Sequence, residues 1–123
     1  PEEDIIEEGI NPLTELGIRA GDSSIVLTEE QKKKMAEYEK KSEEIFRRRF
    51  EREADRIISK VYNKNTMAAS ESKFMAASQK AMEELNSAQE EIASQTAMPS
   101  AKSRLIASQI IDKITNAKKK EIK

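Results

Sequence analysis

The stretch that decides the fold runs from residue 22 to residue 98 and reads DSSIVLTEEQKKKMAEYEKKSEEIFRRRFEREADRIISKVYNKNTMAASESKFMAASQKAMEELNSAQEEIASQTAM. It contains neither glycine nor proline, since all residues of these two types lie at positions 1, 9, 12, 17, 21 and 99. Because glycine and proline are the residues that interrupt helices, we expect this stretch to be helical almost throughout. The sequence therefore predicts an all-α protein built from long helices.

The composition limits how such helices can be stabilised. The chain has 123 residues, of which 37% are charged and 4% aromatic, and its net charge is −1. This length suits one modest domain. Ion pairs on helix surfaces contribute only a few tenths of a kcal/mol each, so the helices must gain their stability by packing against one another or against a partner.

The first long helix has a clear start. Thr28 is followed three residues later by Gln31, which is the pattern of a capping box, and two glutamates suit the first turn of a helix. We predict a helix over residues 28–63. Apolar side chains then recur close to the spacing of one helix face, at Met35, Tyr38, Ile45, Phe46, Phe50, Ala54, Ile57, Ile58 and Val61.

A second helix is expected over residues 66–97, after the weakly helical run at 63–66. Its apolar seam alternates steps of four and three residues, as in a coiled coil, at Phe74, Ser78, Ala81, Leu85, Ala88 and Ile92. Extending the seam backwards would place charged residues such as Glu53 and Lys60 on it. We therefore favour a helical hairpin that bends near 63–66 over one continuous rod, which is the alternative.

The C-terminal region predicts a third helix over residues 101–119, after Pro99. Its apolar stripe lies opposite its lysines and arginine, so the helix is amphipathic. The domain organisation that we expect is an acidic, partly ordered arm at 1–27, a helical hairpin or coiled-coil region at 28–97, and a C-terminal amphipathic basic helix at 98–123.

Charge is segregated along the chain although its total is nearly balanced. The net charge is about −8 over residues 1–30, about +5 over 31–65, about −3 over 66–99 and about +5 over 100–123. Alternating blocks favour helices that fold back on each other. The acidic arm could lie along the chain's own basic helix or meet a basic partner, and we favour the first interpretation.

The sequence argues against an enzyme. It has no histidine and no cysteine, which are the most usual general base and a common nucleophile near neutral pH. Adjacent glutamates such as Glu83 and Glu84 point about 100° apart on a helix and lack the Glu-x-x-His pattern of di-metal sites. We expect no catalytic residues, no cofactor and no metal site.

One polar cluster suggests a second function class. Arg47, Arg48, Arg49 and Arg52 form a dense basic run beside two phenylalanines, and Arg56 continues it. Arginines on a helix can contact phosphates, so the alternative hypothesis is a nucleic-acid-associated assembly factor that uses the segment from Arg47 to Arg56. Interleaved acidic residues favour the simpler interpretation of a solvated helix flank.

The function that the sequence favours is a non-catalytic structural or adaptor subunit. It would bind through helix packing, as a scaffold within a larger protein assembly or as a homo-oligomer. A membrane-surface role of the C-terminal helix is a weaker third interpretation. We expect an intracellular reducing compartment or a virion interior, and the initial proline is compatible with a removed targeting segment. The expected partner-binding anchors are Phe46, Phe50, Ile57, Val61, Phe74, Leu85, Ile92, Ile106 and Ile110.

Overall fold

The structure is a computed structural model that describes residues 26–122. It contains the helices α2 (Glu29–Ser59), α3 (Lys64–Met67), α4 (Glu71–Gln95) and α5 (Ser100–Ile122), and the described residues include no strand. The all-α prediction is therefore confirmed. The predicted acidic arm falls almost entirely on residues 1–25, which lie outside the described residues.

Helix α2 begins at the predicted capping box. The backbone N–H of Gln31 donates to Oγ1 of Thr28 at 3.1 Å, and the backbone N–H of Thr28 donates to Oε1 of Gln31 at 2.9 Å. These bonds satisfy two backbone donors of the kind that a helix start leaves without partners. The helix ends at Ser59, a few residues before the predicted boundary at 63.

The connection from α2 to α4 is organised by Asn63. Its side-chain nitrogen donates to the carbonyls of Ser59 and Lys60, both at 3.0 Å, while its side-chain oxygen accepts from the N–H of Thr66 at 2.9 Å. Asn63 thus closes α2 and caps the short helix α3. The long second helix starts at Glu71, later than predicted, because Ser70 is its cap and Thr66 instead donates to the Lys60 carbonyl.

The turn between α4 and α5 uses an unusual residue. Ala97 has a φ of 57°, the left-handed region that usually takes glycine. The N–H of Met98 donates to the Ala93 carbonyl at 2.9 Å, as in a Schellman cap, and Met98 is buried against the core. Pro99 then supplies the first acceptor of α5, since its carbonyl accepts from the N–H of Ser103 at 2.9 Å.

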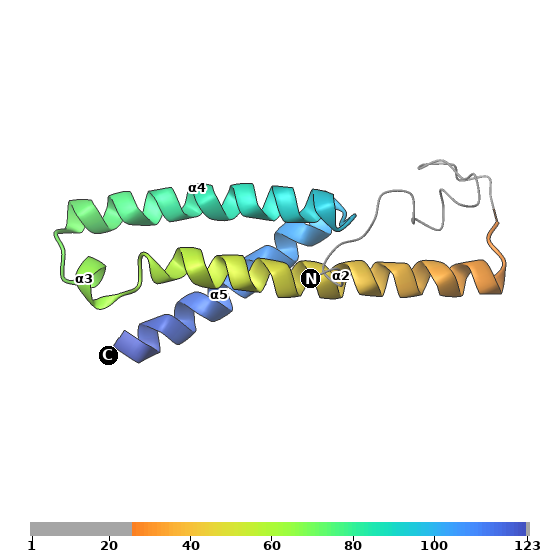
Figure 1. Ribbon diagram of the computed structural model, residues 1–123, viewed down its shortest axis with the longest axis horizontal. Coiled ribbons are helices and arrows are strands. Elements are labelled where there is room, and N and C mark those ends of the chain that lie inside the picture. Colours follow the sequence, from red (N-terminus) through yellow and green to blue (C-terminus); the bar gives the residue numbers. More distant parts are fainter. Residues whose placement is uncertain (1–25, 123) are drawn as a thin grey trace.

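Helix α2 lies at the centre of the arrangement and packs against both α4 and α5 (Figure 1). Helix α4 runs back beside α2, whereas α5 crosses α2 obliquely. The first turns of α2 extend past the end of α4, and burial on α2 begins only at Ser42. The shared core is formed by Phe46, Phe50, Ala54, Ile57, Ile58, Val61, Ala81, Leu85, Ile92, Ala93, Met98, Ile106, Ala107, Ile110 and Ile114.

Aromatic contacts hold the two ends of this core. Phe46 and Phe50 stack with ring centroids 5.6 Å apart, and Tyr62 meets Phe74 edge to face at 6.1 Å. The ammonium of Lys119, near the end of α5, lies 5.6 Å from the centre of the Tyr62 ring. The stacked pair lies within α2, whereas Tyr62, just past the end of α2, contacts α4 through Phe74 and α5 through Lys119.

Candidate functional site

The predicted anchor residues lie in the core of the chain itself. Eight of them are buried, and Phe74 is partly buried at the edge of the same cluster. The buried eight are Phe46, Phe50, Ile57, Val61, Leu85, Ile92, Ile106 and Ile110. These side chains join α2, α4 and α5 to each other, so a partner helix does not meet them on the surface of this fold.

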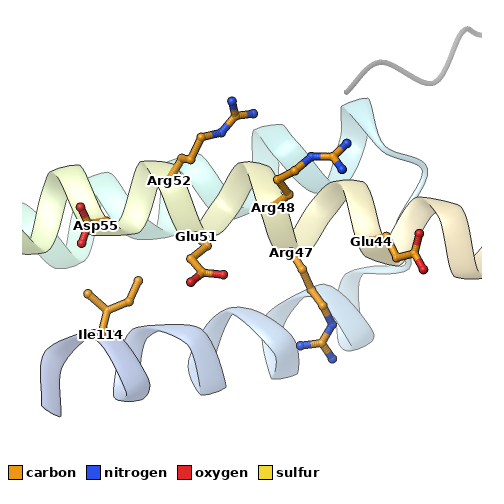
Figure 2. A pocket seen from close by; sticks show the side chains of 7 residues that line it. All are labelled: Glu44, Arg47, Arg48, Glu51, Arg52, Asp55 and Ile114. Carbon is orange, nitrogen blue, oxygen red and sulfur yellow. The ribbon is translucent and has the colours of Figure 1, made fainter. Parts of the chain in front are cut away.

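The arginine run is divided between different sides of α2. Successive helical residues point about 100° apart, and Figure 2 shows Arg47 directed toward α5 while Arg48 and Arg52 point away from it. Arg47 pairs with Glu43 at 3.5 Å, whereas Arg49 donates to Gln95 of α4 at 2.6 Å. The sequence cluster is therefore not one continuous basic surface.

Two hollows beside α2 are lined by both arginines and acidic residues. One of about 580 Å³ is lined by Glu44, Arg47, Arg48, Glu51, Arg52, Asp55 and Ile114, so acidic and basic groups are equal in number there (Figure 2). On the α4 side, a hollow of about 520 Å³ contains Arg49, Arg52 and Arg56 together with Glu53 and Glu91. The hydrogen bond from Arg56 to Glu53 raises the pKa of the Arg56 guanidinium. Interleaved acids weaken the attraction of either hollow for phosphates.

Glu43 joins the start of α5 to α2. Its carboxylate lies 3.2 Å from Nζ of Lys102 and 3.5 Å from Nε of Arg47. The hydrogen bond from Lys102 holds the pKa of Glu43 below its ordinary value, and the charges of both cations add to this effect, although burial opposes it. Two further pairs cross between helices, Lys60 with Glu84 at 3.6 Å and Lys118 with Asp55 at 3.0 Å.

A groove between α4 and α5 exposes apolar surface next to the core. Its volume is about 350 Å³, and we call it the α4–α5 groove. It is lined by Met82, Leu85, Asn86, Gln89, Arg104, Ala107, Ser108, Ile111 and Asp112. Met82, Leu85, Ala107 and Ile111 give the groove apolar surface, whereas Arg104 and Asp112 bring opposite charges to it from α5. Such grooves between helices are common binding sites in all-α proteins.

A line of three side chains along α4 is buried at one end and exposed at the other. Met75, Met82 and Gln89 are seven residues apart and so lie nearly in line along the helix. Gln89 is buried next to the α4–α5 turn, where its side chain donates to Ser103 of α5 at 2.6 Å. Farther from the turn, Met82 and Met75 are 63% and 62% exposed. Helix α5 therefore covers this stripe near the turn and leaves its other end open.

Sequence reasoning missed most residues of this groove, although Leu85 was among the predicted anchors. Met75 and Met82 fell outside the predicted seam, and Gln89, Arg104 and Asp112 were not singled out. The available signal was the seven-residue spacing of Met75, Met82 and Gln89. Because glutamine is polar, this spacing does not stand out as an apolar pattern in the sequence. The predicted seam instead follows the face of α4 whose Ala81, Leu85 and Ile92 belong to the shared core.

Residues 26–122 contain neither a cluster of metal-ligating side chains nor a helix that could span a membrane. No group of three or more aspartate, glutamate, cysteine or histidine side chains in this part of the chain is arranged to hold a metal ion. None of the helices α2 to α5 is both long and apolar enough to cross a membrane.

Comparison of the chain with protein-family models, with curated proteins and with solved structures found no match.

Proposed function

We propose that this chain is a non-catalytic structural or adaptor subunit that binds one amphipathic helix in the α4–α5 groove. The observation that carries the proposal is the α4 stripe, which α5 buries at Gln89 and leaves exposed at Met82 and Met75. A further helix placed beside Met82 would continue the packing that α5 begins. Binding of this kind follows the helix-in-groove mode of peptide recognition.

The chemistry of the stripe suits an incoming helix. Methionine side chains are unbranched and adapt to irregular apolar surfaces, and for this reason they are common where proteins bind helices. Single exposed apolar residues are ordinary on protein surfaces. Here, however, two methionines lie in line and lead into a groove whose floor includes Leu85 and Ala107. An apolar face that continues a core is typical of an interaction surface.

In this proposal, α2 and α4 form a helical hairpin of the coiled-coil type, which we call the platform. Helix α5 packs against both helices of this platform. The predicted anchor residues would contribute by holding the platform together, since their side chains lie in its core. The groove residues would then supply the contacts with the partner helix.

The nucleic-acid hypothesis receives less support from the structure. Arg47 and Arg49 are directed to different sides of α2, and acidic side chains share both arginine-lined hollows. This rival hypothesis predicts binding to DNA or RNA that weakens steeply with salt. It also predicts that replacing Arg48 and Arg52 by glutamate abolishes that binding.

Site-specific photo-crosslinking tests the proposed function. A photo-reactive phenylalanine derivative replaces Met82 in the full chain, expressed in the cells in which the chain occurs. A matched variant carries it at Ser87, which is also exposed on α4 but points about 140° away from Met82. We expect a defined covalent adduct from position 82 whose linked peptide has apolar residues at helical spacing. Adducts of equal yield from both positions, or none from position 82, would contradict the proposal.

A further inference from the structure

The first turns of α2 extend past the turn between α4 and α5 and carry an apolar stripe (Figure 1). Gln31, Met35, Tyr38 and Ser42 are three or four residues apart, so they lie on one side of the helix. We call these four residues the α2 stripe. Ser42 is buried, whereas the other three side chains are partly buried. The α2 stripe thus prolongs the buried face of α2 into the part of the helix that α4 does not accompany.

A hollow lies at the inner end of the α2 stripe, beside the turn between α4 and α5. Its volume is about 260 Å³. Met35 and Tyr38 line it from α2, and Ala97 and Pro99 line it from the turn. A further segment of chain that follows the α2 stripe would therefore find apolar contacts on both sides at this end.

Residues 1–25 have the composition and the attachment point to be that segment. They include seven isoleucine and leucine residues, at positions 5, 6, 10, 13, 16, 18 and 25. They join the described part of the chain at Val26, just before the outer end of the α2 stripe. The stripe spans about 17 Å at 1.5 Å per residue, whereas a chain of this length reaches up to roughly 80 Å when extended. Residues 1–25 are therefore long enough to return along the whole stripe.

Charge favours the same segment. Residues 1–25 contain seven acidic residues and one arginine, so their net charge is −6. Lys34, Lys41 and Arg48 are seven residues apart and form a nearly straight row along one flank of the α2 stripe, which we call the basic row. The other flank carries Lys32 and Glu39, whose charges balance. An acidic segment on the stripe would lie beside these cations, whereas α2 of a second copy would bring like charges to them.

We infer that residues 1–25 bind the α2 stripe of the same chain, with isoleucine and leucine side chains on Met35 and Tyr38 and acidic side chains beside the basic row. Attachment at Val26 keeps this segment near the stripe at an effective concentration that a second chain would match only at about millimolar levels. The occupant of the stripe is thus intramolecular. It is distinct from the helix proposed for the α4–α5 groove, so the two proposals can fail independently.

Photo-crosslinking of the purified full chain tests which segment covers the α2 stripe. A photo-reactive phenylalanine derivative replaces Tyr38, which keeps an aromatic ring at this position. The matched control carries it at Ala36, which is exposed on α2 and points about 160° away from Tyr38. We expect an adduct within one chain that joins position 38 to residues 1–25, in several-fold higher yield than from position 36. Equal yields from the two positions, no adduct with residues 1–25, or such an adduct only between two chains would overturn the inference.

Charge reversal tests the role of the basic row. Lys34→Glu combined with Lys41→Glu places two acids beside the α2 stripe, so we expect the yield of the adduct from position 38 to fall by about threefold or more. The control combines Lys33→Glu with Lys40→Glu, which changes the net charge equally and at the same spacing on the opposite side of α2. This control should keep the original yield, and circular dichroism checks that both variants remain helical. Equal yields from the two variants would show that the basic row does not hold residues 1–25 and would overturn the inference.

Discussion

The side chain of Gln89 on α4 donates a hydrogen bond to Oγ of Ser103 on α5 at a distance of 2.6 Å, and both residues are buried. Ser103 in turn donates to the Ser100 carbonyl at 3.0 Å. This polar link lies where α4 and α5 meet behind their turn. Because a buried polar group is costly unless it is hydrogen-bonded, the link specifies how the two helices are aligned and where the α4–α5 groove begins.

A double-mutant cycle on this pair should show direct coupling. Gln89→Met retains much of the side-chain volume but removes the donor, and Ser103→Ala removes the acceptor. We expect each single change to lower the free energy of unfolding by about 1–2 kcal/mol. The double variant should lose less than the sum, with a coupling of about 0.5–1.5 kcal/mol. Urea unfolding followed by circular dichroism measures these values, and strictly additive losses would show that the bond does not contribute.

The turn between α4 and α5 should become more stable with glycine at position 97. Ala97 occupies the left-handed region, which costs a residue with a β-carbon about 1–2 kcal/mol. Glycine avoids that cost but loses more entropy on folding, so we expect Ala97→Gly to raise the free energy of unfolding by about 0.5–1 kcal/mol.

The same substitution elsewhere provides the control for that prediction. Ala76 is exposed within α4 and has ordinary helical geometry. We expect Ala76→Gly to lower the free energy of unfolding by about 1 kcal/mol. Changes of the same sign at both positions, measured by thermal unfolding, would show that the left-handed geometry of Ala97 carries no cost.

The sequence predicted helix boundaries well where side chains bond to backbone groups a few residues away. Thr28 with Gln31 predicted the start of α2, and the structure confirms the capping box. The start of α4 could not be chosen in the same way, because Thr66 and Ser70 are both suitable caps. Only the bonds of Asn63 to Ser59, Lys60 and Thr66 decide between them.

The candidate surfaces were harder to predict because they depend on the angles between helices. The apolar spacing that identified Phe50 and Leu85 shows that they are covered, but it does not say which helix covers them. In this fold they are covered by the chain itself. Met82 remains exposed because α5 crosses α2 obliquely and leaves α4, and that crossing follows from the packing of three helices at once.

Acid should weaken the contact between α5 and α2 through Glu43. Its pKa is lowered in the folded chain, mainly by the hydrogen bond from Lys102. The folded state therefore favours the carboxylate, and the resulting stability is fully present above the ordinary pKa of about 4.5. It is lost as the pH falls through the lower pKa of the folded state.

Variants of this ion pair test the acid dependence. We expect Glu43→Gln to lower the free energy of unfolding at neutral pH by a few tenths to about 1 kcal/mol and to reduce the loss seen below about pH 4.5. Lys102→Gln should have the same effect, and combining the two changes should add little. An unchanged acid limb in urea unfolding between neutral pH and pH 3 would exclude this role.

Truncating a core side chain and truncating a groove side chain should affect stability very differently. Phe50 is fully buried and stacks on Phe46 at 5.6 Å, so Phe50→Ala should lower the free energy of unfolding by about 3–5 kcal/mol. That is a large part of the roughly 5–15 kcal/mol typical of a small domain. Met82→Ala removes an exposed side chain and should change the same quantity by less than about 0.5 kcal/mol. The Met82 variant should instead weaken the binding of a helix in the groove. If urea unfolding gave Phe50→Ala no more effect than Met82→Ala, then Phe50 would not lie in the core of the chain in solution, and its predicted role as a contact for a partner would become the better explanation.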